Sequence, residues 1–243
     1  KSEQPGPNKV NQLDNKFWGE QVADFIKEVI QKNNSEKTIV IGNSLGSLVA
    51  LTVSVTHSNL IKALIAAPLP DPALMKSRPL VLKKTNWFKT INKKLVRIFF
   101  NIFPFKILIT FIAKTRLIDI GLQFAYFRSI KNDLALKQIV KKPAQKVTAS
   151  RALKAMCIGM ATREDFYTAP FLLNRLEKMT ARAPFLLIWG RKDKLVPLFI
   201  GKRLINRYHW IKLIIIENTG HCPHDESPDE FNQCVINWLR LNS

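Results

Sequence analysis

Residues 38–49 read TIVIGNSLGSLV, and this stretch decides the fold of the chain. Four residues suited to a buried strand, Thr38–Ile41, run into the pentapeptide GNSLG, and a helical pattern of small and apolar residues follows at once. A G-x-S-x-G sequence between a strand and a helix is typical of a nucleophile carried on a tight turn. Such a turn forces strained backbone angles, so we expect Gly42 and Gly46 to remove Cβ atoms that would clash with the neighbouring strand and helix.

Ser44 is therefore the candidate nucleophile. The turn directs its hydroxyl outward at the carboxyl end of the strand. The backbone amide of Leu45, together with the positive end of the helix that begins there, can stabilise an oxyanion that develops on a substrate. Ser44 and Leu45 thus predict a site for attack on a carbonyl carbon.

Two later strands each carry a candidate partner for Ser44 at their carboxyl ends. The apolar run Phe185–Trp189 leads into Asp193, and the run Lys212–Glu217 leads into His221. Because side chains from different strands converge at the carboxyl edge of a parallel sheet, Ser44, Asp193 and His221 can meet there. His221 would take the proton of Ser44 and Asp193 would orient the imidazole ring, so that a covalent acyl-enzyme forms and is then hydrolysed.

Other histidines and carboxylates remain alternatives for these roles. His224 lies three residues after His221 and is the rival base, and Asp71 follows a strand and is the rival acid. Structural position favours His221, which comes directly after a strand-loop glycine, and Asp193, which lies in the turn that leaves a strand. The remaining candidates have structural interpretations at a helix end, before a strand or as caps of the last helix: His57, His209, Asp225 and Asp229.

Strand and helix patterns alternate at both ends of the chain but not in its middle. We expect a helix capped by Asp14 and four strands, at Thr38–Ile41, Leu60–Ala67, Phe185–Trp189 and Lys212–Glu217. A proline cluster after the second strand marks a boundary, and a succession of basic amphipathic helices follows. The sequence therefore predicts an α/β fold with a mostly parallel sheet, its core formed by residues 1–70 and 181–243. Residues 71–180, the cap segment, form a helical insertion between them.

The charge of the chain is its compositional anomaly. The 243 residues include 38 Lys and Arg against 18 Asp and Glu, a formal net charge of +20, and the cap segment alone holds 22 basic and 6 acidic residues. A basic surface fits nucleic acid or an anionic membrane, but no nucleic-acid-binding motif is present, so we expect no nucleic-acid partner.

Three irregularly spaced cysteines, Cys157, Cys222 and Cys234, argue against a disulfide framework or a zinc site and favour a reducing compartment.

Several motifs resemble those of one family. GNSLG, the GRKDKLVP turn around Asp193 and above all GHCPHDESPDEFN around His221 are similar to those of cyanobacterial and plastid α/β-hydrolases, the group that includes pheophytinase and chlorophyll dephytylase. WGEQVADFIKEVI, which precedes the first predicted strand, is similar to the same group. The resemblance covers residues 1–70 and 181–243, whereas the cap segment is similar only in length and character.

The resemblance implies a triad of Ser44, Asp193 and His221, with Leu45 in the oxyanion hole. It implies hydrolysis of a carboxylic ester without a metal or organic cofactor, with a phytyl ester of a chlorophyll-type pigment as the leading substrate. It also implies about eight strands, whereas the sequence supplies half that number. KSEQPGP, at residues 1–7, looks like the end of the loop after the family's fourth strand. We therefore expect the first strands, and the loop that gives the second oxyanion donor, to be missing from this chain.

The cap segment falls where hydrolases of this fold place a lid over the carboxyl edge of the sheet. Its most apolar run, residues 95–113, is almost long enough to span a bilayer, but Arg97, Asn101, Pro104 and Lys106 interrupt it. We expect instead an amphipathic lid whose apolar face covers a lipophilic substrate and whose lysines meet an anionic membrane surface. A solvated basic surface is the alternative.

We therefore predict an α/β-hydrolase that acts as a serine esterase on a lipophilic small-molecule ester, in the cytoplasm and at the periphery of a thylakoid-like membrane. Among enzymes the alternative is another reaction of the same scaffold, such as that of a thioesterase, a C–C bond hydrolase or a perhydrolase. Outside enzymes the alternative is a catalytically silent, membrane-associated binding protein, which the pair of Ser44 and His221 disfavours.

Overall fold

The computed structural model describes residues 13–33, 36–75 and 86–242 of the chain. Its strands are β1 (Thr38–Asn43), β2 (Ile61–Ala67), β3 (Phe185–Gly190) and β4 (Ile211–Ile216), which form one parallel sheet in the order β1-β2-β3-β4. The four strands that the sequence predicts are thus confirmed. The segment compared with a family loop, residues 1–7, lies outside the described residues.

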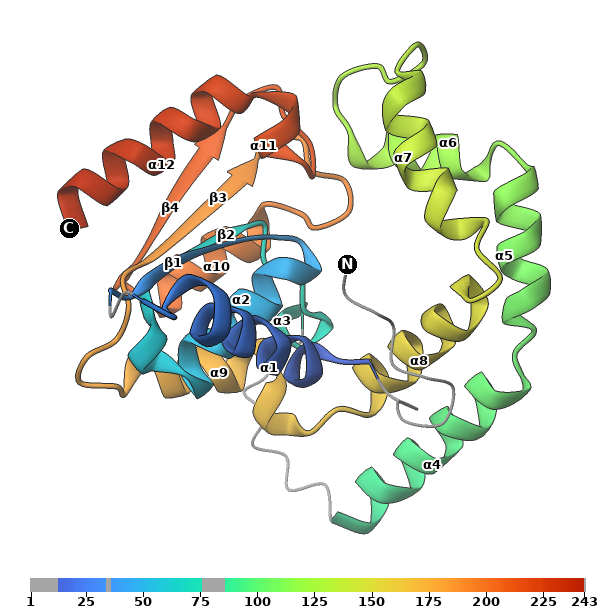
Figure 1. The fold of residues 1–243 in the computed structure, drawn as a ribbon, viewed down its shortest axis with the longest axis horizontal. Coiled ribbons are helices and arrows are strands. Elements are labelled where there is room, and N and C mark those ends of the chain that lie inside the picture. The colour runs from blue at the N-terminus through green and yellow to red at the C-terminus, as the bar shows by residue number, and fades with distance from the viewer. Residues whose placement is uncertain (1–12, 34–35, 76–85, 243) are drawn as a thin grey trace.

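Helices connect these strands and cover the sheet (Figure 1). They are α1 (Asn15–Phe25), α2 (Leu45–Thr56), α3 (Pro72–Met75), α4 (Asn86–Ile102), α5 (Phe105–Lys114), α6 (Leu117–Ala125), α7 (Leu134–Ala144), α8 (Ala149–Thr162), α9 (Ala169–Glu177), α10 (Phe199–Arg207), α11 (Pro223–Glu226) and α12 (Pro228–Asn242). A π-helical turn, Ile26–Ile30, extends α1. Asp14 caps α1 as predicted, because its carboxylate accepts a hydrogen bond from the backbone N–H of Phe17 at 2.9 Å.

The central strands β2 and β3 are buried on both faces of the sheet, which explains their continuous apolar runs. Side chains alternate along each strand: Ile65 and Ile188 pack with α12, whereas Leu64 and Leu187 pack with α2, α9 and α10 on the opposite face. Figure 1 shows α12 on one side of the sheet and these three helices on the other. The chain therefore has the α/β fold with a parallel sheet that the sequence predicts, and the sheet and its helices form three layers.

The interval between β2 and β3 is filled by helices α3 to α9, and α4 to α8 form an arc beside the sheet (Figure 1). Among the described residues, no single helix is both long and apolar enough to cross a membrane. The pair Thr90–Ile102 and Phe105–Ile112 reaches that length and composition only together, and its axis bends by 58° at the break. The division of the chain into a core and a cap segment stays a prediction.

A buried ion pair joins the chain where it enters the cap segment to the chain where it leaves. Asp71, which follows β2, accepts a 2.7 Å hydrogen bond from the Arg163 guanidinium through Oδ1 and a 2.7 Å hydrogen bond from the backbone N–H of Ala169 through Oδ2. The Asp71 side chain is fully buried and that of Arg163 nearly so. A buried carboxylate needs such partners, because desolvation of an unpaired charge is costly.

We expect Arg163→Met to destabilise the chain by about 3 kcal/mol or more, because it leaves the Asp71 carboxylate buried without its cation. Lys16→Met is the matched control, because Lys16 pairs with Glu164 at 3.6 Å where both side chains are exposed, and such pairs contribute less than about 1 kcal/mol. Urea unfolding of both variants measures the difference. Equal losses would show that the buried pair does not anchor the cap segment.

Candidate active site

The turn between β1 and α2 has the strained backbone that its sequence predicts. Ser44 has φ 51° and ψ −122°, and it is one of two non-glycine residues with positive φ in the described part of the chain. A residue held in such a conformation costs about 1–3 kcal/mol, which the surrounding structure must supply. Ser44 follows the carboxyl end of β1 directly, and Leu45 begins the helix that follows.

The two glycines of the motif play different roles. A Cβ atom on Gly42 would clash with the backbone of Gly46 and Ser47, so the glycine allows β1 and α2 to approach closely, as expected. A Cβ atom on Gly46 would meet no described atom within 4 Å. The expectation for Gly46 is therefore wrong in this structure, because that position is exposed on the first turn of α2 and faces no described strand or helix.

Two neighbouring side chains that the sequence analysis missed fix this turn. The hydroxyl of Ser47 donates to the Gly42 carbonyl at 2.7 Å and accepts from the backbone N–H of Ala67 at 3.0 Å. The side-chain amide of Asn43 donates to the carbonyl oxygens of Ala67 and of His221, the latter at 3.1 Å. Asn43 and Ser47 thus hold the turn against β2. Asn43 also joins the turn to the histidine loop, residues 217–222 between β4 and α11, which carries His221. The pentapeptide GNSLG gives no signal for the contacts with Ala67 and His221, because these residues lie at the end of β2 and in the loop after β4.

Asp193 and His221 are in direct contact. The Nδ1 atom of His221 lies 2.9 Å from Oδ2 of Asp193, and both side chains are buried. The other carboxylate oxygen of Asp193 accepts 2.8 Å hydrogen bonds from the backbone N–H groups of Leu195 and Val196. Asp193 is therefore held from two sides, by the two backbone amides on one oxygen and by His221 on the other.

Close backbone contact explains why these two loops lie together. A Cβ atom on Gly190, at the end of β3, would clash with the carbonyl oxygens of Thr219 and Gly220. The backbone N–H of Lys192 donates to the Thr219 carbonyl at 2.9 Å, which adds a direct bond between the two loops. Gly190 thus lets the turn that carries Asp193 lie against the loop that carries His221.

Ser44 is linked to this pair through the side chain of its neighbour Asn43 rather than through its own side chain. Its neighbour Asn43 bonds to the main chain of His221, but among the described residues no hydrogen bond joins the Ser44 hydroxyl to the His221 ring. The structure thus brings Asp193 and His221 together directly and Ser44 near them. The assignment of the three as a triad, with Leu45 as an oxyanion donor, stays a prediction.

The rival residues have other partners. Asp71 is occupied by Arg163 at the base of the cap segment. His224 lies on α11, where its ring packs edge-on against Phe231 with centroids 6.1 Å apart. Asp225 lies in α11 and pairs with Arg128 at 3.4 Å, so its interpretation as a cap of the last helix is wrong.

Two titratable side chains close to His221 are held in their neutral forms. Burial raises the pKa of the Cys222 thiol, which is one of three free cysteines. Burial, assisted by a hydrogen bond with Asp225, also raises the pKa of the Tyr126 phenol. Both groups therefore stay protonated at neutral pH, and neither supplies a nucleophile that would compete with a serine.

With this geometry in place, comparison with known proteins defines the class. A sequence model described as the alpha/beta hydrolase family matches residues 12–233, so the chain belongs to the alpha/beta hydrolase family. The parallel sheet, the strained serine turn and the helices on both faces agree with that fold.

Individual relatives are distant. Chloroplastic pheophytinase of Arabidopsis thaliana is 26% identical over 233 residues, which cover 92% of this chain and 44% of that protein. A 2-hydroxy-6-oxononadienedioate/2-hydroxy-6-oxononatrienedioate hydrolase of Klebsiella pneumoniae is 42% identical over 57 residues, which cover 24% of this chain and 20% of that protein. The crystal structure of a serine hydrolase involved in carbazole degradation superposes with a TM-score of 0.65 at 20% identity, covering 98% of this chain and 74% of the other. The matches span less than half the length of these two curated relatives.

We expect Ser47→Ala to destabilise the chain by about 1–3 kcal/mol, because the backbone N–H of Ala67 loses its buried acceptor. Ser54→Ala is the matched control: Ser54 is also buried on α2, but its hydroxyl only donates to the Ala50 carbonyl within the same helix. Its loss should be smaller, within about 1 kcal/mol. Chemical unfolding of both variants checks the difference, and equal effects would mean that the bond to Ala67 does not hold the turn.

Proposed function

We propose that this protein hydrolyses carboxylic esters of lipophilic small molecules, with Ser44 as nucleophile, His221 as base and Asp193 as its orienting acid. The observation that carries the proposal is the 2.9 Å contact between Asp193 and His221, beside a serine held at positive φ. Buried acid and histidine pairs of this kind set the tautomer of the imidazole.

The proposed reaction follows from the orientation of the His221 ring. With Nδ1 directed at Asp193, the Nε2 atom is left to accept the proton of Ser44 as the serine oxygen attacks the ester carbonyl. The backbone N–H of Leu45 stabilises the oxyanion, and Nε2 then returns the proton to the departing alcohol. Water, activated by the same nitrogen, cleaves the acyl-enzyme. The residues proposed for these steps need neither a metal nor an organic cofactor.

A phytyl ester of a chlorophyll-type pigment is the proposed substrate. Two observations support it: the extended, though distant, similarity to pheophytinase and the large apolar side chains of the cap segment, which suit a long isoprenoid alcohol. A C–C bond hydrolase is the second candidate, because the short match to the Klebsiella hydrolase has the higher identity. Release of phytol from the pigment, or cleavage of a 2-hydroxy-6-oxo dienoic acid, distinguishes the two reactions.

We also propose that α4 and α5 lie on an anionic membrane, which gives a cytoplasmic protein a peripheral location. Four of the exposed residues of α4 are large, apolar and at helical spacing, and two on α5 add to them: Leu95, Ile98, Phe99 and Ile102, with Ile107 and Phe111. Exposed cations accompany them at Lys94, Arg97 and Lys106, and residues 72–118 contain no Asp or Glu. An apolar helix surface with cations alone complements anionic lipid headgroups.

In the full-length protein, we expect a fluorophosphonate probe to label Ser44 at a rate that falls by at least about 10³-fold in Ser44→Ala and in His221→Ala. His224→Ala is the matched control and should label like the wild type, because His224 is not bonded to a carboxylate in the site. Labelling is read by gel fluorescence and by mass spectrometry of the modified peptide. A folded wild-type protein that does not label would rule out the esterase and favour a silent membrane-associated binder.

For the membrane contact, we expect the protein to co-sediment with vesicles containing phosphatidylglycerol and not with pure phosphatidylcholine. Binding should weaken by about tenfold or more in Ile102→Ser/Ile107→Ser and in Lys94→Glu/Arg97→Glu, because each change removes apolar burial or headgroup attraction. Leu241→Ser is the control, since Leu241 is as exposed but lies at the end of α12, away from α4 (Figure 1). Equal binding to both kinds of vesicle would contradict the membrane contact and show that the basic residues form an ordinary solvated surface.

A further inference from the structure

Glu226 bonds two segments of the chain that are about a hundred residues apart. Its Oε1 atom accepts a 2.7 Å hydrogen bond from the backbone N–H of Gly220, in the histidine loop. Its Oε2 atom accepts 2.6 Å and 3.1 Å hydrogen bonds from the backbone N–H groups of Phe127 and Arg128, which follow α6 in the cap segment. One carboxylate thus satisfies three backbone donors, and bonds to an ionised acceptor are stronger than neutral ones.

His221 itself is part of this contact. Its backbone N–H donates to the carbonyl of Ala125, the last residue of α6, at 2.7 Å. A Cβ atom on Gly220 would lie 2.5 Å from the same carbonyl oxygen and 2.8 Å from the backbone nitrogen of Phe127, so the glycine allows the two main chains to touch. The place of the proposed base is therefore fixed by the end of α6 as well as by Asp193.

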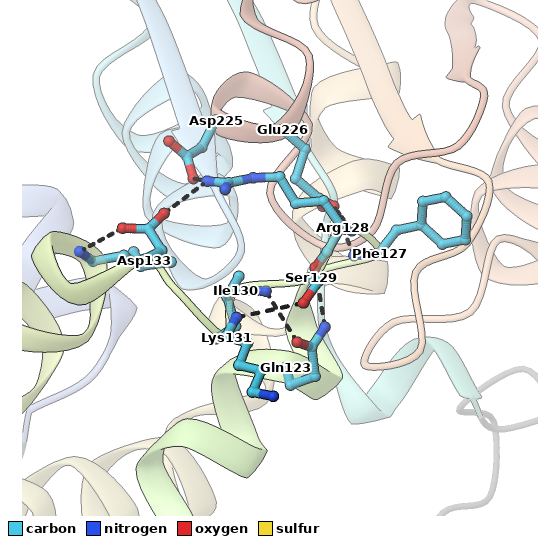
Figure 2. Close-up of polar contacts among 10 residues, drawn as sticks. Gln123, Phe127, Arg128, Ser129, Ile130, Lys131, Asp133, Asp225 and Glu226 are labelled. Atoms are coloured by element: carbon cyan, nitrogen blue, oxygen red, sulfur yellow. Dashed lines mark hydrogen bonds and ion pairs between the residues drawn. The ribbon is translucent and has the colours of Figure 1, made fainter.

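The cap side of this contact is ordered by its own polar side chains (Figure 2). Gln123 accepts from the backbone N–H of Ile130 and donates to the carbonyl of Arg128, each at 3.0 Å. The Arg128 guanidinium lies between Asp133 and Asp225, at 3.2 Å and 3.4 Å. These residues hold the turn after α6 so that its first amides point at Glu226.

The two kinds of contact differ in expected strength. The ion pairs of Arg128 are exposed, and such pairs contribute little. The Glu226 carboxylate instead accepts from three main-chain donors at once, and its bond to Gly220 in the histidine loop is partly buried, so that losing the oxygen that serves Gly220 removes the acceptor of that donor. A glutamine at this position has one acceptor oxygen and could serve only one of the two segments.

We propose that Glu226 is a positioning residue for His221: it holds the histidine loop against the turn after α6, and so makes the place of the base depend on the cap segment. The proposal rests on the proposed role of His221 in ester hydrolysis. A misplacement of the base by about 1 Å can cost about 10²-fold in rate, so a loosened loop lowers turnover even in a folded protein.

The test compares Glu226→Gln with Asp225→Asn in the full-length protein. Asp225 is the matched control, because it lies on the same helix and contacts the same turn through Arg128 but does not bond to the histidine loop. Hydrolysis of a p-nitrophenyl ester, per active site titrated with fluorophosphonate, should show kcat lower by about tenfold or more in Glu226→Gln, with KM changed by less than about threefold. Asp225→Asn should change neither.

Amide hydrogen exchange gives a readout that does not need activity. In Glu226→Gln we expect faster exchange at Gly220 and also at His221, whose N–H bonds to Ala125 and not to Glu226. Unchanged exchange at His221, or equal loss of kcat in both variants, would overturn the proposal. If the wild type is inactive, the proposed function fails, while exchange at His221 still decides whether Glu226 positions its loop.

Discussion

The buried carboxylate of Asp193 is the constraint on which the site depends. Its side chain is fully buried, so the desolvation of its charge has to be offset by partners at fixed places. The amides of Leu195 and Val196 serve one oxygen, and His221 serves the other. Because the amides belong to the turn after β3, the histidine loop has to lie against that turn. Gly190 permits this approach, and the end of the sheet thereby becomes a place where side chains from separate strands meet.

A second buried carboxylate organises the cap segment in the same way. Asp71 and Arg163 close the base of the segment in a buried pair, whereas the far attachment, around Glu226 and Arg128, lies nearer the surface. Regions with fewer buried contacts open at a lower free energy than buried ones. We therefore expect local opening to begin at the Glu226 side and to leave the Asp71 side closed. The attachment that opens first is also the one that contacts the histidine loop.

The parts of the structure that depend on a local pattern of residues could be predicted from the sequence. The strands, the α1 cap at Asp14 and the strained Ser44 follow from apolar runs and from turn chemistry over a few residues. The ion pair of Asp71 with Arg163 could not be predicted, because the two residues lie 92 positions apart and no local signal joins them. The same holds for Glu226 and Phe127, 99 residues apart. The expectation for Gly46 is wrong for another reason. The motif includes a glycine at this position, but only the atoms around it decide whether a Cβ atom would clash.

Two of the places where the described structure exposes apolar residues differ in what can cover them. β1 pairs along one edge only, with β2, and Ile41 on this strand is 53% exposed, although the strand reads as a buried one. A free strand edge has backbone donors and acceptors that lipid cannot satisfy, so only water or another strand can meet them. The helices α4 and α5 satisfy their own backbone groups, and their exposed surface is apolar and basic. Lipid can therefore cover α4 and α5 at no cost in hydrogen bonds, whereas the edge of β1 needs water or another strand.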